Sequence, residues 1–100
     1  MANILTPTEA ANVLRTGEDD PTMLQLLPLV DSYVKNATGR DWAADSPVRP
    51  EAKAAAQMLL VMWHENPGMI GGQNALSFGL TAVLVQLEAL ALQLAEAEAA

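Results

Sequence analysis

His64 is the only histidine in the chain, and Glu65 follows it directly. Histidine is the side chain best suited to proton transfer near neutral pH, so the pair could form half of a general acid–base site. Catalysis of this kind normally needs a second positioned group, and one histidine without cysteine is too few ligands for a transition metal. We therefore interpret His64 as a partly exposed helix residue beside a solvated carboxylate, and we expect neither an enzyme nor a cofactor.

Other patterns that resemble reactive or binding sites also favour structural roles. The acidic run Glu18-Asp19-Asp20 lacks the spacing of a calcium loop and suits a capped turn. Gly71-Gly72 follows no strand and has no P-loop lysine nearby. None of the serines considered as nucleophiles lies in a nucleophile-elbow context: Ser32, Ser46 and Ser77.

The composition describes a small, acidic and apolar chain. It has 100 residues, 51% of them hydrophobic, and 12 acidic residues against 5 basic ones give a net charge of −7. This length fits one domain, and the apolar fraction is too high for a disordered chain. A free-standing nucleic-acid binder would need a basic face. The N-terminus lacks the charge and apolar run of a secretory signal, and the long C-terminal apolar segment is interrupted by Gln86, Glu88, Gln93, Glu96 and Glu98. We expect a soluble protein.

The first two helices are predicted from their end signals. Thr6-Pro7-Thr8-Glu9 combines an N-cap, an early proline and a capping-box glutamate, so a helix should run from there to about Arg15 and stop at Gly17. Asp20-Pro21 should begin the second helix, and Gly39 should end it. We expect Pro28 to bend this helix. Its predicted apolar stripe is Met23, Leu27, Val30, Val34 and Ala37.

The third helix should be central in the fold. It follows a loop from Gly39 to Arg49, its start lies at Asp45, Ser46 or Pro50, and the helical pattern lasts to about Asn66. Its two apolar stripes are Ala52, Ala55, Ala56, Leu59, Met62 and Trp63, and Ala54, Met58 and Val61. A helix that is apolar around most of its circumference should have neighbours on several sides.

Ser77 should cap the last helix, which begins at Phe78 or Gly79. Its predicted core face is Leu80, Val83, Leu84, Leu87, Leu90, Ala91 and Leu94. Val85 and Leu92 lie one heptad apart on the other side, either as scattered exposed residues or as a subunit contact. The Glu/Ala end should project or fray unless a partner holds it. Trp42, just past a helix end, either packs over the core or anchors a partner. The candidate interface residues are Val85, Glu88, Leu92, Glu96, Glu98 and Trp42.

These elements predict an all-α fold, a small four-helix bundle-like domain with one short and three longer helices and an extended C-terminal helix or tail. Several segments, in this order, resemble the head–tail connector (adaptor) proteins of long-tailed bacteriophages. They are Leu5–Arg15, the turn Glu18–Asp20, the helix end Asp31–Trp42, Leu59–Asn66 and Leu76–Leu80. Trp63-His64-Glu65-Asn66 stands where members often carry Trp-Tyr-Glu-Asn, and Ser77 replaces a usual proline. The likeness covers about residues 4–87, and the segment from Glu88 is longer and richer in alanine than in compact members.

The resemblance implies one connector domain over residues 1–100, with a core of about 4–87 and a C-terminal extension of 88–100. It implies a virion protein of the neck, between capsid and tail, made in the host cytoplasm. Such proteins form a homo-oligomeric ring, commonly a dodecamer, beneath the portal protein and dock the stopper or tail-completion protein. DNA passes through the channel without sequence-specific binding, and no membrane is involved.

The residues also leave an alternative open. The chain could be a small soluble regulatory or adaptor domain that binds a partner helix in a groove lined by Met58, Met62 and Trp63. Ring formation would distinguish this domain from a connector.

Overall fold

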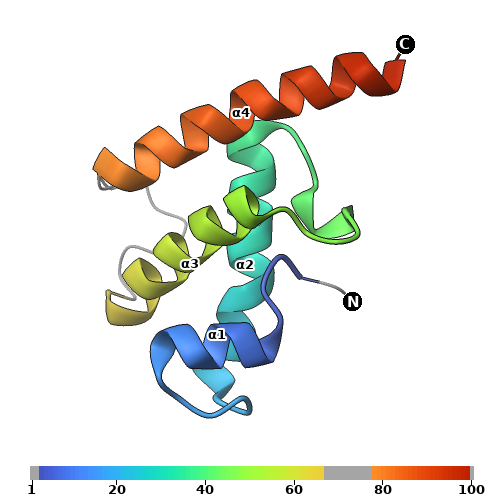
Figure 1. Ribbon diagram of the computed structural model, residues 1–100. Helices are drawn as coiled ribbons and strands as arrows, with labels where there is room; N and C mark the ends of the chain where they lie inside the picture. Colours follow the sequence, from blue (N-terminus) through green and yellow to red (C-terminus); the bar gives the residue numbers. More distant parts are fainter. Residues whose placement is uncertain (1–2, 67–77, 100) are drawn as a thin grey trace.

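The computed structural model describes residues 3–66 and 78–99, and within them it has four α-helices and no strand (Figure 1). This confirms the predicted all-α fold. The helices are α1 (Pro7–Leu14), α2 (Pro21–Thr38), α3 (Pro50–Glu65) and α4 (Phe78–Ala99), with a short 3₁₀ helix, η1 (Trp42–Ala44), between α2 and α3. Of the starts considered for the third helix, Pro50 is the observed one. The proposed Ser77 cap lies outside the described residues.

Helix α1 begins as predicted and ends at Leu14, next to the predicted end near Arg15. Glu9 N donates to Thr6 Oγ1 at 3.1 Å, and Thr6 N donates to Glu9 Oε1 at 3.0 Å, which completes the capping box. The stop is Arg15, which adopts a left-handed conformation with φ 57°, so the prediction of Gly17 as the stop was wrong. After this end the chain turns toward Asp20, the N-cap of α2. There Thr16 Oγ1 donates to Asp20 Oδ2 at 3.1 Å.

Both predicted ends of α2 are confirmed. Asp20 Oδ1 accepts from Thr22 N at 3.1 Å, and Gly39 closes the helix with φ 81°. The buried face is Met23, Leu26, Leu27, Val30, Val34 and Thr38. Ala37 is exposed, so its predicted place in the core was wrong. Thr38 lies four residues beyond Val34, and its hydroxyl donates to Val34 O at 2.7 Å, which makes its burial tolerable.

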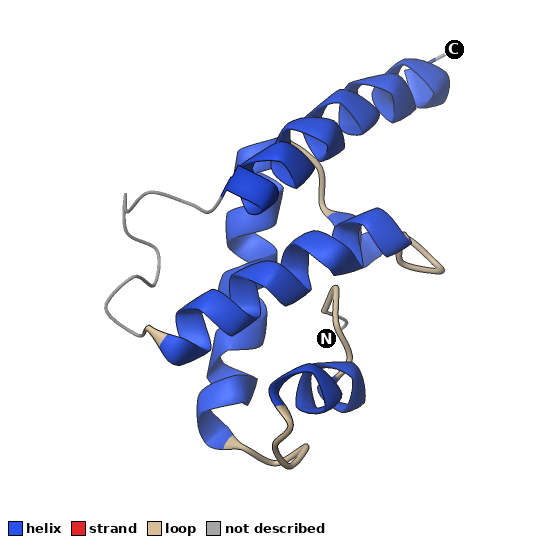
Figure 2. Ribbon diagram, turned by 60° about the vertical axis from the view of Figure 1, so that its left-hand side comes forward, coloured by secondary structure: helices blue, strands red, loops and turns tan. Residues whose placement is uncertain are grey.

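Helix α3 lies between the other helices and packs against α1, α2 and α4 (Figures 1 and 2). Its neighbours on several sides were therefore predicted correctly. Its buried residues are Ala52, Ala55, Ala56, Leu59, Leu60 and Trp63. The predicted second stripe stays on the surface, since Ala54 and Met58 are exposed and Val61 is only partly covered. The core thus uses one side of α3 and leaves the other open.

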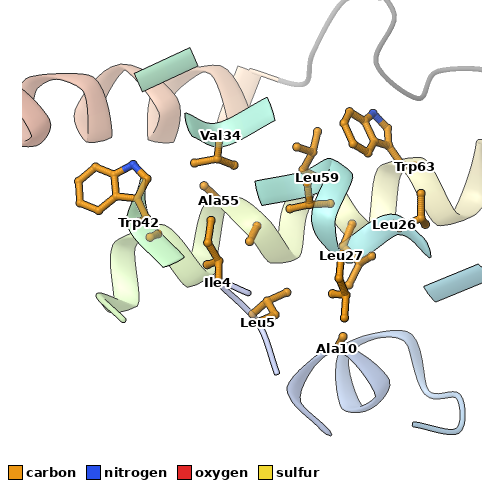
Figure 3. Packing of buried hydrophobic residues seen from close by; sticks show 14 of the residues in the cluster. Ile4, Leu5, Ala10, Leu26, Leu27, Val34, Trp42, Ala55, Leu59 and Trp63 are labelled. Atoms are coloured by element: carbon orange, nitrogen blue, oxygen red, sulfur yellow. The ribbon is translucent and has the colours of Figure 1, made fainter. Parts of the chain in front are cut away.

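The segment before α1 contributes to the core as well. Ile4 and Leu5 are each 1% exposed and point toward Ala55 and Leu27 of the helices above them (Figure 3). Ile4 N donates to Asp31 Oδ1 of α2 at 3.1 Å, which fastens this segment across the fold. The N-terminal limit of the predicted core, near residue 4, agrees with these contacts.

Helix α4 covers one side of the core and then continues past it (Figure 1). Leu80, Leu84, Leu87 and Ala91 are buried, and Leu94 is partly buried against them. The predicted core face of this helix, which included Ala91 and Leu94, is thus confirmed, and the division into a core to residue 87 and an extension of 88–100 stays a prediction. By length and composition alone, Gly79–Glu98 is long and apolar enough to cross a membrane, the single such stretch among the described residues. A helix that lends one face to a core passes the same test, so the expectation of no membrane stays a prediction.

Candidate interaction surface on helix α4

Val85 and Leu92 are the most exposed large hydrophobic side chains in the described structure, at 61% and 64%. They are seven residues apart on one helix, so they lie on the same side, turned away from Leu84 and Ala91. Most surface apolar residues are scattered singly. Val85 and Leu92 share one side of the helix with Glu88 between them, and we call this side the ridge; whether it is a subunit contact stays a prediction.

Exposed residues at spacings of three and four extend this ridge along α4. We call the set Thr81, Val85, Glu88, Leu92 and Glu96 the α4 stripe. At one end of it, a shallow hollow of about 120 Å³ lies between α2 and α4 and is lined by Ala37, Thr81, Leu84, Val85 and Glu88. The exposure of Ala37 gives it a place on this surface, beside the small depression.

All charges on α4 are negative. Glu88, Glu96 and Glu98 are its only ionisable residues, and the helix has no lysine or arginine. Glu98 Oε1 accepts from Arg40 Nη1 at 3.0 Å. Within the described part of the chain, Glu88 and Glu96 form no ion pair, so the α4 stripe presents uncompensated negative charge beside its apolar ridge.

The end of α4 is held by the chain itself. Arg40 Nη2 lies 2.7 Å from Asp45 Oδ1, and the guanidinium carbon lies 5.4 Å from the Trp42 ring centroid. Hydrogen bonds to Asp45 and then to Glu98 raise the pKa of Arg40 above its usual range. Of the two expected outcomes for the Glu/Ala segment, it projects past the core and does not fray, since α4 stays helical to Ala99. Arg40 was not among the predicted site residues, and a contact to Glu98 across 58 residues has no local signal.

Trp42 does not belong to this surface. Its side chain is 1% exposed, and Nε1 donates to Thr38 Oγ1 at 2.8 Å inside the core (Figure 3). The packing alternative for Trp42 is confirmed, and its assignment as an interface residue was wrong. Its burial follows from η1, which turns the ring back over the end of α2.

His64 contacts an acidic residue other than the expected one. Its Nε2 lies 3.6 Å from Asp20 Oδ2, which joins the end of α3 to the N-cap of α2. Desolvation works against ionisation of Asp20, but hydrogen bonds from Thr16 and from two backbone N–H groups outweigh it and lower its pKa. The His64–Asp20 pair is thus part of a helix cap. No group of three or more metal-ligating side chains lies within the described residues.

Asp31 is the carboxyl group whose pKa is shifted far from its usual value. It borders a hollow of about 370 Å³ together with Ser32, Lys35 and Asp41. Burial raises its pKa from 3.8 to about 6, the N–H of Ile4 opposes the shift, and the negative charge of Asp41 adds to it. Ser32 forms no hydrogen bond with Asp31 in the structure, so the hollow holds a half-buried carboxyl group without an activated nucleophile.

A wider apolar hollow of about 510 Å³ lies between α1 and α3. Its lining residues are Val13, Gln57, Met58, Val61, Met62, Glu65 and Asn66. Met58 and Met62 were predicted to line a groove, and they do. Trp63 does not, because it is 2% exposed and packs edge-on against Tyr33 with ring centroids 5.4 Å apart. That part of the groove prediction was wrong.

Comparisons of the chain with protein-family models, with curated proteins and with solved structures each found no match.

Proposed function

We propose that the chain is a virion structural protein, a head–tail connector that forms a ring below the portal, extends the DNA channel and docks the stopper or tail. The observation that carries this proposal is the α4 stripe, a preformed apolar ridge on a helix that reaches beyond its own core. A monomeric regulatory domain has no need for such a projection. A subunit that docks on a second protein, such as the portal, does.

The distribution of charge supports this role. Of the five basic residues, Arg40 and Lys53 already pair with acidic groups of the same chain, Lys53 Nζ lying 2.6 Å from Glu9 Oε2. Few cations remain to attract phosphates, and the net charge of −7 repels them. A ring of such subunits would let DNA slide through without adhering to it.

The shape of the subunit is compatible with a closed ring. Its extents are 43 × 29 × 17 Å, and α4 runs across one end of the fold (Figure 1). A closed ring requires head-to-tail contacts between two different patches of each subunit. The α4 stripe provides one patch, and we propose that it contacts the portal or the neighbouring subunit.

The experiment is native mass spectrometry of the purified chain, alone and with the portal protein of the same virus. We expect a large cyclic oligomer on the portal, with or without a ring in isolation. The double variant Val85→Ser/Leu92→Ser should prevent this assembly. The control is Leu24→Ser/Leu29→Ser, which removes two exposed leucines of α2 (40% and 46% exposed). A chain that stays monomeric and does not bind the portal would contradict the proposal.

A second function is favoured by the hollow between α1 and α3. Met58, Val61 and Met62 border it, and methionine-rich surfaces adapt to varied partner helices. We propose as the alternative a small helical regulatory or adaptor domain that binds a partner helix there. Met58→Glu would then abolish binding of the partner helix, and Val85→Ser/Leu92→Ser would leave that binding intact. For a connector we expect the reverse, with assembly lost in Val85→Ser/Leu92→Ser and kept in Met58→Glu.

A further inference from the structure

We propose that the α4 stripe binds a basic amphipathic helix of another protein. The inference deepens the proposed connector function by stating the chemistry of the partner that α4 contacts. It depends on the exposure, the charge and the fixed position of α4, and each of these is visible in the structure.

The α4 stripe has the sequence pattern of one helix of a two-helix coiled coil. Val85 and Leu92 stand one heptad apart, Glu88 lies between them on the same side, and Thr81 precedes Val85 by one turn. The hollow of about 120 Å³ beside Ala37 and Val85 can accept an aliphatic side chain from a helix laid along α4. The partner should therefore present leucine or a similar residue at heptad spacing.

The charges on the stripe determine what flanks those leucines. Glu88 and Glu96 have no ion pair in the described structure, and α4 carries no positive charge that could offset them. Opposite charges across a helix pair set partner choice, whereas like charges facing each other cost binding energy. The flanking positions of the partner should accordingly be lysine or arginine.

A second copy of this chain is a poor occupant. Two α4 helices packed through the stripe would face Glu88 with Glu88 or Glu96 in either direction. The basic residues outside the ion pairs do not form a complementary row. Arg15 ends α1, Lys35 lies on α2 and Arg49 precedes α3. The positive charges must come from a different protein.

The stripe is also preorganised. Its first half is fixed because Leu80, Leu84, Leu87 and Ala91, on the adjacent face of the helix, are buried in the core, and the contact of Glu98 with Arg40 holds its end. Ordering a surface before binding removes part of the entropy cost of association. A single stripe is smaller than a stable stand-alone interface, so an isolated partner helix should bind weakly and reversibly.

The test uses the full chain and two synthetic peptides of about three heptads, both with leucine at the a and d positions. One has lysine and arginine at e and g, and the other has glutamate there. Binding is measured by fluorescence anisotropy. We expect binding of the basic peptide only. Val85→Ser/Leu92→Ser should weaken it about tenfold or more, through loss of apolar burial. Leu24→Ser/Leu29→Ser on α2 should leave it unchanged.

A charge series separates specific from general attraction. Glu88→Gln/Glu96→Gln should reduce binding of the basic peptide several-fold and flatten its salt dependence between about 50 and 300 mM. The matched pair Glu51→Gln/Glu65→Gln, on exposed positions of α3 with no ion pair, should not. Equal losses in both pairs would show unspecific attraction and overturn the inference, as would dimerisation of the chain through Val85 and Leu92.

The outcome is distinguishable from failure of the connector proposal. Portal binding that needs Val85 and Leu92, without any preference for the basic peptide, would keep the connector and reject the stated partner chemistry. Specific peptide binding by a chain that forms no ring and ignores the portal would keep the basic helix and reject the connector.

Discussion

Arg40 and Glu98 are 58 residues apart in the sequence, yet Nη1 of the first lies 3.0 Å from Oε1 of the second. The two partners differ in exposure, since the Arg40 side chain is 19% exposed and the Glu98 side chain is 64% exposed. Arg40 is fixed by Asp45 and Trp42, whereas Glu98 comes from a helix end with few other contacts. Arg40 thus gives the last turn of α4 an ion pair with the body of the fold, at the end of the α4 stripe.

Replacing Glu98 with Gln should loosen the end of α4 with little effect on global stability, because an exposed ion pair contributes little to the free energy of unfolding. Amide hydrogen exchange should become faster from about residue 95 onward and stay unchanged near Leu84. Glu96→Gln is the matched control, since Glu96 has no such partner. Equal exchange in both variants would show that Arg40 does not hold the helix end.

Replacing Thr38 with Val should destabilise the fold, although the two side chains have nearly the same size. The Thr38 hydroxyl accepts from Trp42 Nε1 at 2.8 Å and donates to Val34 O, and both groups are buried. Valine has the same shape but leaves the indole N–H unpaired, at a cost of about 1–3 kcal/mol. Urea unfolding checks this, with Thr81→Val at an exposed position as the control. A loss no greater than that of the control would mean that the indole finds another acceptor.

Replacing Asp31 with Asn should stabilise the protein at neutral pH. Burial raises the pKa of Asp31 to about 6 in the folded chain, against 3.8 for the free side chain, so folding disfavours its charged form. Its contribution to stability is therefore fully present below about pH 4 and is lost as pH rises through about 6. Asparagine keeps an acceptor for the Ile4 N–H without the charge, and the gain at pH 7 should be about 1–2 kcal/mol after allowance for solvent screening.

The measurement for Asp31 is the difference in unfolding free energy between Asp31→Asn and the parent chain from pH 4 to pH 8. The difference should be small at pH 4 and should grow through pH 6. Asp19→Asn, an exposed change of the same type, should show no such rise. A constant difference across this range would mean that Asp31 titrates as it does in the unfolded chain.

Features encoded by neighbouring residues were predictable, and features that depend on how segments meet were not. The Thr6–Glu9 capping box and the Asp20 cap each involve side chains within three residues of the groups they bind, so the sequence contains the whole motif. The exposure of Val85 and Leu92 followed from helical periodicity in the same way. Burial of Trp42 depends on the turn of η1, and the Ile4–Asp31 hydrogen bond spans 27 residues. No local pattern encodes either of them.

The end of α1 at Arg15 likewise depends on how two segments meet. A glycine two residues later suggested the stop of α1, but the path toward the Asp20 cap requires the turn at Arg15, which adopts φ 57°. A residue with a Cβ atom costs about 1 kcal/mol in this region, and glycine does not. Arg15→Gly should therefore stabilise the protein by about 0.5–1 kcal/mol, because the Arg15 side chain is exposed and forms no ion pair in the described structure. Asn12→Gly, inside α1, should destabilise it by about the same amount. Thermal unfolding of the two variants decides the matter, since a loss of stability in Arg15→Gly would contradict the left-handed end of α1.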